Sequence, residues 1–312
     1  MGNLSTREAY GKSLAEFGKK YDFFVLDADL AKATQTLVFQ KEFPNRFFNM
    51  GISEGDMMTT AAGMAACGKT VFASTFAMFA AGRAYEQIRN SIAYPNLHVI
   101  IGATHSGVLI GEDGASHQCI EDISLMRTIP NMTVIVPCDE KSVYAAVEAA
   151  ICQNGPVYIR MGRLAAETVY QEKPKFAIGK GNVLKDGTDL TIAAVGDLVP
   201  EALKAAAKLE EKGVSTAVLD LACVKPIDEE LIKKYARKTG KIITAEDHNV
   251  IGGLGSAVSE IIAQEGTARL QRVGMQDCFG RSGTKDALQS YFKLNAAGIL
   301  EAYEKFEIAE NK

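Results

Sequence analysis

The stretch VIIGATHSGVLIGEDGASHQ, residues 99–118, begins as an apolar run and continues as a polar, glycine-rich loop. Its first six residues, VIIGAT, are apolar enough for a strand buried in a parallel sheet. Because ligands of open α/β sheets gather beyond the carboxyl ends of strands, His105 is well placed for chemistry, with Asp113 and His117 in the same loop. The residues alone leave two alternatives, solvated loop histidines and the rim of an active site.

Apolar strands alternate with helical patterns on both sides of this stretch. The alternation predicts an α/β fold with parallel sheets covered by helices on both faces. Strands are expected at residues 23–28, 46–50, 70–75, 99–104, 133–136, 156–160, 190–195, 216–221, 241–246 and 268–275. Helices are expected at residues 5–20, 54–67, 76–94, 119–128, 139–153, 199–212, 228–239, 255–264 and 296–306.

The alternating pattern weakens between Met161 and Lys180, where charged and small residues and a proline follow one another. Such a stretch favours a boundary between two domains, at residues 1–165 and 185–312, joined by a linker at 166–184. The first expected helix begins with Ser5 and Glu8, which have the spacing of a capping box.

Composition excludes several classes of protein. The chain has 312 residues, 47% of them hydrophobic and 23% charged, which is ordinary for a globular protein of two domains. The net charge of -4 and the scattered basic residues argue against nucleic acid or an anionic membrane as a partner. Six cysteines without CxxC spacing argue against zinc or disulfide sites. With no signal-peptide pattern and no apolar run long enough to span a membrane, a cytoplasmic protein is expected.

One segment imitates a dinucleotide-binding turn. Gly253-Leu-Gly255-Ser-Ala-Val258 follows the expected strand 241–246. The third glycine is missing, and eight residues separate the strand from Gly255, so the tight turn that places a pyrophosphate on a helix N-terminus is not expected. The sequence also lacks a GxxxxGKS or GxxxxGKT loop, and we expect no phosphate cradle in this chain.

Three further residues have a functional and a structural interpretation. Glu54 opens the expected helix 54–67 in an uncharged stretch, where its carboxylate is either a desolvated catalytic group or an acid that complements the helix dipole. Phe76 and Phe79 lie one turn apart, and their spacing alone favours core residues.

Taken together, these segments resemble the transketolase family of thiamine diphosphate enzymes over essentially the whole chain. The resemblance rests on five pieces in this order: GISEGDMMTTAAGMA from residue 51, STFAMFAAGRAYEQIRNSIAYPNL from 74, ATHSGVLIGEDGASHQCIEDISLMRTIPNMTVIVP from 103, GPVYIRMGR from 155 and AEDHNVIGGLGSAVSE from 245. Some are generic alone, but their order is highly specific. The resemblance implies a pyrimidine-binding domain followed by the C-terminal α/β domain of that family.

The resemblance implies roles at the cofactor. Glu54 would share a proton with a nitrogen of the aminopyrimidine ring, so that the cofactor's own imino group can remove the thiazolium proton. Phe79, with Phe76 beside it, would stack on the aminopyrimidine, because a flat heteroaromatic ring needs a flat apolar partner. Asp29 matches a residue that reaches the thiamine part of the cofactor.

The resemblance also implies roles at the substrate. His105 and His117 match two histidines that assist proton movement at the substrate hydroxyls, and Asp113 matches an acid that contacts a sugar hydroxyl. Arg160 matches the arginine that binds the terminal phosphate, with a surface salt bridge as its structural alternative. Arg7 falls where the family has a second phosphate contact.

The sequence departs from the family at two places. Ala33 stands where members commonly carry a phosphate-binding serine, so that Thr34 takes over this contact or the contact is lost. The chain also lacks the Gly-Asp-Gly and later asparagine that bind diphosphate and magnesium in the family, so no metal ligand is expected here. The resemblance then implies a separate N-terminal subunit that holds thiamine diphosphate and magnesium, in a heterotetramer with the active site between chains.

The sequence therefore predicts the C-terminal subunit of a two-chain transketolase of the pentose phosphate pathway. Such an enzyme transfers a two-carbon ketol unit from a ketose phosphate to an aldose phosphate through a thiamine diphosphate carbanion, and it would be active only with its N-terminal subunit. One alternative is the beta subunit of a 2-oxoacid dehydrogenase decarboxylase, or the corresponding half of a deoxyxylulose-phosphate synthase. Another is a non-catalytic, partner-binding subunit, which the intact Glu54, His105 and His117 disfavour.

Overall fold

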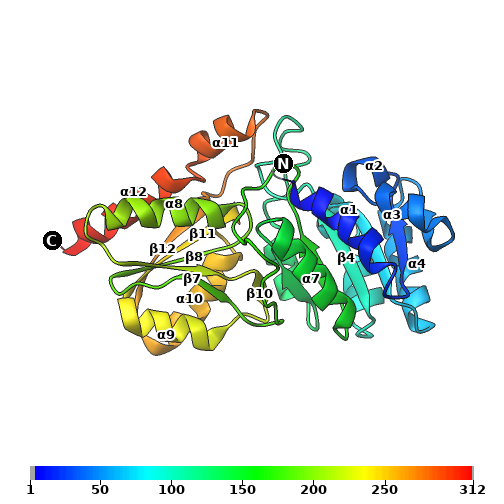
Figure 1. Cartoon of the computed structure of the whole chain (residues 1–312), viewed down its shortest axis with the longest axis horizontal. Helices are drawn as coiled ribbons and strands as arrows, with labels where there is room; N and C mark the ends of the chain where they lie inside the picture. The colour runs from blue at the N-terminus through cyan, green and yellow to red at the C-terminus, as the bar shows by residue number, and fades with distance from the viewer. Residues whose placement is uncertain (1–3, 311–312) are drawn as a thin grey trace.

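Two mostly parallel sheets lie side by side and form the framework of the molecule (Figure 1). The computed structural model describes residues 4–310. The first sheet has seven strands in the order β10-β5-β6-β4-β3-β1-β2, and the second has five in the order β12-β11-β8-β9-β7. We call the first sheet with its helices the first domain, and the second sheet with its helices the second domain. The strands of the first sheet are β1 Phe24–Asp27, β2 Phe47–Asn49, β3 Val71–Phe76, β4 Val99–Thr104, β5 Thr133–Ile135, β6 Val157–Arg160 and β10 Cys223–Lys225. Those of the second are β7 Asn182–Lys185, β8 Leu190–Ala194, β9 Thr216–Asp220, β11 Lys241–Asn249 and β12 Arg269–Met275.

Helices cover both faces of each sheet, as the sequence predicts. In the first domain α1, α3 and α7 pack on one face, and α4, η2, η3 and α6 pack on the other. In the second domain α8 and α12 share one face, and α9 and α10 share the other. The helices are α1 Thr6–Phe17, α2 Ala31–Thr34, α3 Leu37–Glu42, η1 Pro44–Arg46, α4 Glu54–Ala66, η2 Phe79–Arg83, α5 Tyr85–Gln87, η3 Ile88–Ala93, α6 Asp122–Thr128, α7 Glu140–Cys152, α8 Leu198–Glu210, α9 Glu229–Thr239, α10 Leu254–Glu265, α11 Lys285–Phe292 and α12 Ala296–Glu310.

Strand β4 lies in the middle of the first sheet, where it pairs in parallel with β3 and β6. All six of its residues are buried, which explains why its sequence is an unbroken apolar run rather than an alternating one. Because β1, β3, β4 and β6 are parallel, their carboxyl ends meet at the same edge of the sheet. The polar loop that follows β4 therefore lies beside the loops that follow β1 and β6.

Local signals account for several helix boundaries. The Ser5 N–H donates to Glu8 Oε2 over 2.9 Å and the Glu8 N–H donates to Ser5 Oγ over 3.3 Å, so the predicted capping box is confirmed. The expected helix at 76–94 is interrupted, because η2 and η3 are π-helical turns on either side of α5. Hydrophobic spacing does not reveal such wide turns, which are frequent at functional sites.

The sheets do not divide where the sequence places the domain boundaries. Strand β7 begins inside the expected linker 166–184, and β10, from the expected second domain, joins the first sheet by antiparallel pairing with β5. A three-residue strand carries too short a pattern for prediction from hydrophobic spacing. The outermost residues of the two expected domains, 1–3 and 311–312, lie outside the described residues.

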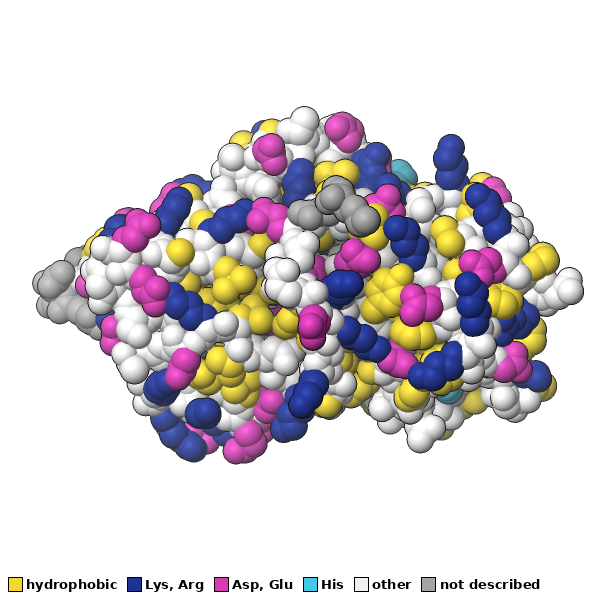
Figure 2. Space-filling model, in the orientation of Figure 1, with side chains coloured by type: hydrophobic (Ala, Val, Ile, Leu, Met, Phe, Trp, Pro, Cys, Tyr) yellow, Lys and Arg dark blue, Asp and Glu magenta, His cyan; other side chains and the backbone are white. Residues whose placement is uncertain are grey.

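The surface mixes charges of both signs. On the face shown in Figure 2, Lys and Arg side chains are interspersed with Asp and Glu side chains and with small apolar areas. Within residues 4–310 we find no helix with the length and apolar character needed to cross a membrane.

Candidate active site

A cavity of about 470 Å³ lies at the carboxyl edge of the first sheet. It collects side chains that are far apart in the sequence, from α1, α2, the end of β3 and the loops after β4 and β6. The lining residues are Arg7, Ala33, Phe76, His105, Asp113, His117 and Arg163. Five of these are site residues that the sequence predicts, so the predicted substrate-binding group is largely brought together.

His105 is the first residue after β4, and its backbone adopts a left-handed conformation with φ of 57°. This conformation is uncommon for a residue other than glycine and is frequent at functional sites. The imidazole is 2% exposed and stacks on the Phe76 ring, with 3.8 Å between ring centroids. Burial, followed by the nearby Arg7 and Arg163, lowers the pKa of His105 to about 3, so the imidazole is neutral at physiological pH.

The Nδ1 atom of His105 lies 2.9 Å from the Thr104 Oγ1, which leaves Nε2 for another partner. His117 approaches from the far end of the same loop and meets Phe79 edge-on, with 5.4 Å between centroids. Its Nδ1 lies 3.0 Å from the Ser116 Oγ. The two histidines and the two phenylalanines thus form one ring cluster beside the cavity.

Glu54 is the first residue of α4 and is only 2% exposed. Its Oε1 accepts a hydrogen bond of 2.8 Å from Arg83, whose guanidinium carbon lies 4.3 Å from the centre of the Phe79 ring. The Phe79 ring stacks on Phe76 with 5.7 Å between centroids. A buried carboxylate and a flat aromatic surface therefore lie close together, linked through Arg83. The sequence analysis gave Arg83 no role, although its position four residues after Phe79 in a helical segment was an available signal.

Two guanidinium groups face the cavity. Arg7 Nε donates to the Arg163 carbonyl over 2.9 Å, and Arg7 Nη1 donates to the Ala33 carbonyl over 2.9 Å. Arg163 Nη1 donates to the Ile110 carbonyl over 2.8 Å and lies 3.4 Å from Asp113 Oδ1. Burial and, next, repulsion from Arg163 lower the pKa of Arg7. A bound anion would relieve this repulsion, so this end of the cavity suits a phosphate or a similar group.

Arg160 does not line the cavity, and its substrate contact stays a prediction that its burial disfavours. The side chain is 5% exposed, and Nε donates to both carboxylate oxygens of Asp122 over 3.0 and 2.9 Å. Nη2 donates to the carbonyls of Cys119 and Asp247 over 3.3 and 2.8 Å. Arg160 is therefore committed to the interface between the two domains, and Arg163, three residues later, occupies the cavity instead.

Two other predicted contacts have different outcomes. Asp29 is exposed and accepts a hydrogen bond of 2.9 Å from Asn49, and its contact to a cofactor stays a prediction. Thr34 is fully buried, and its Oγ1 donates to Asp27 over 2.7 Å. Because Thr34 faces the interior, it cannot replace the phosphate contact that is missing at Ala33.

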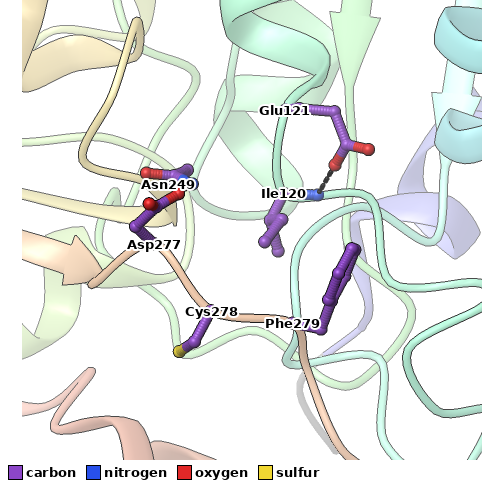
Figure 3. A pocket seen from close by; sticks show the side chains of 6 residues that line it. All are labelled: Ile120, Glu121, Asn249, Asp277, Cys278 and Phe279. Carbon is purple, nitrogen blue, oxygen red and sulfur yellow. Dashed lines mark hydrogen bonds between the residues drawn. The ribbon is translucent and has the colours of Figure 1, made fainter.

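A second hollow, of about 250 Å³, lies between residues 120–121, just after the loop that carries both histidines, and the second domain. No predicted site residue lines it. Figure 3 shows its lining residues, Ile120, Glu121, Asn249, Asp277, Cys278 and Phe279. The Ile120 N–H donates to Glu121 Oε2 over 2.7 Å at its edge.

Family models match both parts of the chain. The model described as transketolase, pyrimidine binding domain, matches residues 2–168, and the one described as transketolase, C-terminal domain, matches residues 179–299. Together they cover both sheets and every cavity residue.

Similar proteins fall in the same family. A protein described as a transketolase C-terminal section from Methanocaldococcus jannaschii is 52% identical over 94% of this chain and 93% of its own length. A subunit of a 6-deoxy-6-sulfo-D-fructose transketolase from Clostridium sp. is 40% identical over 98% of this chain and 95% of its own length. A 1-deoxy-D-xylulose-5-phosphate synthase from Geobacter sulfurreducens is 37% identical over 99% of this chain, which spans 49% of that enzyme.

A solved structure has the same fold over nearly its full length. It is described as the inactive beta4 tetramer of a split gene transketolase, and it is 51% identical to this chain with a TM-score of 0.91, over 97% of this chain and 98% of that one. This chain belongs to the transketolase family, as a C-terminal section composed of its pyrimidine-binding and C-terminal domains.

Proposed function

We propose that this chain is the C-terminal subunit of a transketolase that transfers a two-carbon ketol unit between sugars with an anionic end. The observation that carries the proposal is one cavity that combines a neutral His105 with His117, Asp113 and a pair of arginines. Imidazole and carboxylate groups suit sugar hydroxyls, and paired guanidinium groups suit a phosphate. Such a polar, basic cavity fits a sugar with several hydroxyl groups and an anionic end, which offers it more partners than a short 2-oxoacid.

The neighbouring residues fit the pyrimidine end of thiamine diphosphate. Glu54 supplies the buried carboxyl group and Phe79 the flat apolar surface that an aminopyrimidine ring requires. When bound, this cofactor supplies the nucleophilic carbon that makes and breaks the carbon–carbon bond. We assign the diphosphate and magnesium to a separate N-terminal subunit, because the chain matches, over nearly their full length, a transketolase C-terminal section and a chain of a split gene transketolase. No cluster of three or more His, Cys, Asp or Glu side chains within residues 4–310 has an arrangement that could hold a metal ion.

Different side chains of this chain then have different roles in the reaction. Glu54 holds a proton at the ring nitrogen of the pyrimidine, while Arg83 keeps its carboxylate in place. His105 presents Nε2 to a substrate hydroxyl, because Thr104 occupies Nδ1. Arg7 and Arg163 bind the anionic end and thereby orient the sugar along the cavity.

A deoxyxylulose-phosphate synthase half is the second candidate, because a 37% identical relative carries that name. The two activities differ in their donors, since the synthase type would decarboxylate pyruvate whereas a transketolase would cleave a ketose. Among the relatives named as transketolase subunits, one acts on a sulfonated sugar and another on apulose 4-phosphate. The arginine pair would accept a sulfonate as well as a phosphate, so the donor must be identified by experiment.

The test is reconstitution. The purified chain is mixed with an N-terminal subunit that carries Gly-Asp-Gly, thiamine diphosphate and magnesium, and is then supplied with a ketose phosphate, a sulfonated ketose or pyruvate. We expect ketol transfer by the mixture and none by the chain alone, and light scattering should show a heterotetramer. Turnover by the chain alone, or pyruvate decarboxylation without ketol transfer, would contradict the proposal.

A further inference from the structure

The second domain makes hydrogen bonds to the loop that carries Asp113 and His117. We call residues 105–118 the cavity loop. Asp247, near the end of β11 in the second domain, accepts hydrogen bonds from the N–H groups of Val108 and Leu109 over 2.9 and 3.1 Å. Its side chain is 3% exposed, so both bonds are shielded from water.

A second side chain ties the other end of the cavity loop. Gln118 is also 3% exposed, and its Nε2 donates to the carbonyls of Val108 and Gly111 over 3.1 and 3.4 Å. The same nitrogen donates to the Arg281 carbonyl of the second domain over 2.8 Å. Gln118 therefore closes the cavity loop on itself and fastens it to the second domain.

Each domain carries a glycine where the side chain of the other enters. At Gly107 of the cavity loop, with φ of 73°, an added Cβ would lie 1.9 Å from Asp247 Oδ2. At Gly280 of the second domain, an added Cβ would lie 1.8 Å from Gln118 Oε1. Both contacts are too close for any other residue, so the two surfaces are fitted to each other at these points.

Asp247 is itself held in place from the first domain. Arg160 Nη2 donates to the Asp247 carbonyl over 2.8 Å, while Arg160 Nε is anchored on Asp122. Burial raises the pKa of the Asp247 carboxyl to about 6, against the lowering effect of Arg160 and of the two N–H donors. Near neutral pH the carboxylate is charged, and charged acceptors make the stronger hydrogen bonds.

Apolar packing holds Val108 and Leu109 of the cavity loop against the second domain, where they share a buried cluster with residues such as Leu198 and Leu288. The hollow in Figure 3 separates Ile120 and Glu121 from Asp277, Cys278 and Phe279 of the second domain. Apolar packing does not fix direction, so the hydrogen bonds of Asp247 and Gln118 set the orientation of the loop backbone.

We propose that Asp247 is a positioning residue for the reaction: from the second domain it sets the cavity loop so that Asp113 and His117 meet the substrate. This inference rests on the proposed function. Asp247 does not line the cavity, so it acts only through the loop. Glu54 lies on α4 and is held by Arg83, so its action on the cofactor does not depend on the cavity loop.

The test compares Asp247→Asn with a matched control, Asp228→Asn. Asparagine has the shape of aspartate, but its NH2 group would face one of the two N–H donors and leave it without an acceptor. Asp228 is also a buried carboxylate that accepts two backbone N–H groups, from Gly181 and Leu231 over 3.2 Å each, but it lies away from the cavity loop.

The first readout is hydrogen exchange on the isolated chain. In Asp247→Asn the amides of Val108 and Leu109 should exchange roughly tenfold faster, because local opening of the loop becomes easier. In Asp228→Asn they should not change. This measurement needs no ketol transfer, so it separates failure of this inference from failure of the proposed function. Unchanged loop exchange in Asp247→Asn would overturn the inference.

The second readout is a kinetic split in the reconstituted complex. For Asp247→Asn we expect kcat/KM for the ketose donor to fall about 10- to 100-fold, because small misplacements of contact groups have effects of this size. Exchange of the thiazolium proton should stay at the wild-type rate, because it depends on Glu54. An equal loss of both activities, or the same loss in the control, would show a merely structural role. If Asp247→Asn does not fold, Gln118→Met removes the bond to Arg281 together with those to Val108 and Gly111, and it should give the same split.

Discussion

The loops after the buried parallel strands β4 and β11 differ, because of these two only the loop after β4 lines the cavity of the candidate active site. After β11 the chain turns through residues 250–253 into α10, in the segment whose sequence imitates a dinucleotide-binding turn. There Glu246 Oε2 accepts from the Leu254 N–H over 2.7 Å, and Oε1 accepts from the Gly255 N–H over 2.8 Å. The protein's own carboxylate thus takes the place that a bound phosphate would take at a helix N-terminus.

The difference teaches what turns a strand end into a binding site. At the end of β11 the polar groups already have partners within the chain, and a Cβ at Gly253 would lie 2.0 Å from Glu246 Oε2. At the end of β4 the groups around the cavity keep open positions, such as Nε2 of His105 and the guanidinium of Arg163. The parallel topology creates both strand ends. A strand end can bind a ligand only where its polar groups lack hydrogen-bond partners within the chain.

The prediction with the largest expected effect concerns the candidate active site. Glu54→Gln should reduce ketol transfer in the reconstituted complex by about 10²- to 10⁴-fold, because an amide cannot share a proton with the pyrimidine nitrogen. The amide oxygen can still accept from Arg83, so the temperature of thermal unfolding should hardly change. The measurements are ketol transfer, thiazolium proton exchange by NMR and thermal unfolding. Wild-type proton exchange in the variant would leave Glu54 as an acid that only complements the helix dipole.

The second prediction compares Arg163, which lines the cavity, with Arg160, which is buried and hydrogen-bonded within the protein. Arg163→Ala should raise KM for a phosphorylated ketose about 10- to 100-fold, because a charge-assisted hydrogen bond is lost. KM for hydroxypyruvate should stay close to the wild-type value, since this short donor carries no phosphate. Arg160→Met should instead lower the free energy of unfolding by about 3 to 5 kcal/mol, because it leaves the buried Asp122 carboxylate without its positively charged partner.

Kinetics with both donors and urea unfolding of both variants give the measurements. Equal effects of Arg163→Ala on the two donors would remove Arg163 from the anion site. A well-folded Arg160→Met complex with a raised KM for phosphorylated sugars only would restore the original assignment of Arg160.

The prediction with the smallest expected effect concerns the turn after β11, where Glu246 accepts the hydrogen bonds. Burial raises the pKa of Glu246 to about 7, against the lowering effect of its two N–H donors. In the unfolded chain the ordinary value is about 4.3, so between these values the folded state binds more protons and stability falls as the pH rises. This contribution is fully present below about pH 4 and is lost as the pH rises through about 7.

Glu246→Gln removes the titration, so the difference between wild type and variant isolates it from His248 and Asp247 nearby. From pH 5 to pH 8, wild type should lose about 2 kcal/mol of unfolding free energy relative to Glu246→Gln. Urea unfolding at several pH values measures this difference. A difference that does not change with pH would show that Glu246 is charged throughout.

The sequence was most informative where burial is complete. The strand Val99–Thr104 begins and ends where its apolar run predicts, because a strand covered on both faces is composed mostly of apolar residues. His105, Asp113 and His117 could be placed together because they share the loop after that strand. Strand β10 could not be predicted, because its pairing depends on a neighbour almost ninety residues away in the chain, at Val134 and Ile135.

Side-chain direction was the other limit. Arg160 and Arg163 are three residues apart, and only the packing of α6 and β11 decides that the first turns inward to Asp122. Thr34 has the right chemistry for a phosphate contact but points to Asp27. Arg83 and Asp247 were missed because they act through other protein groups, so that neither matches a pattern of substrate-binding residues.

Strand β10 decides how this chain can be dissected. Figure 1 shows it between the two halves of the molecule, where it pairs with β5. The Val136 N–H beyond β5 also donates to the Ala222 carbonyl over 2.7 Å. A fragment cut after residue 168, where the first family model ends, would lose these partners and expose a bare edge of its sheet, which invites aggregation. Chimaeras that exchange the first domain between relatives would therefore have to carry residues 222–225 along with it.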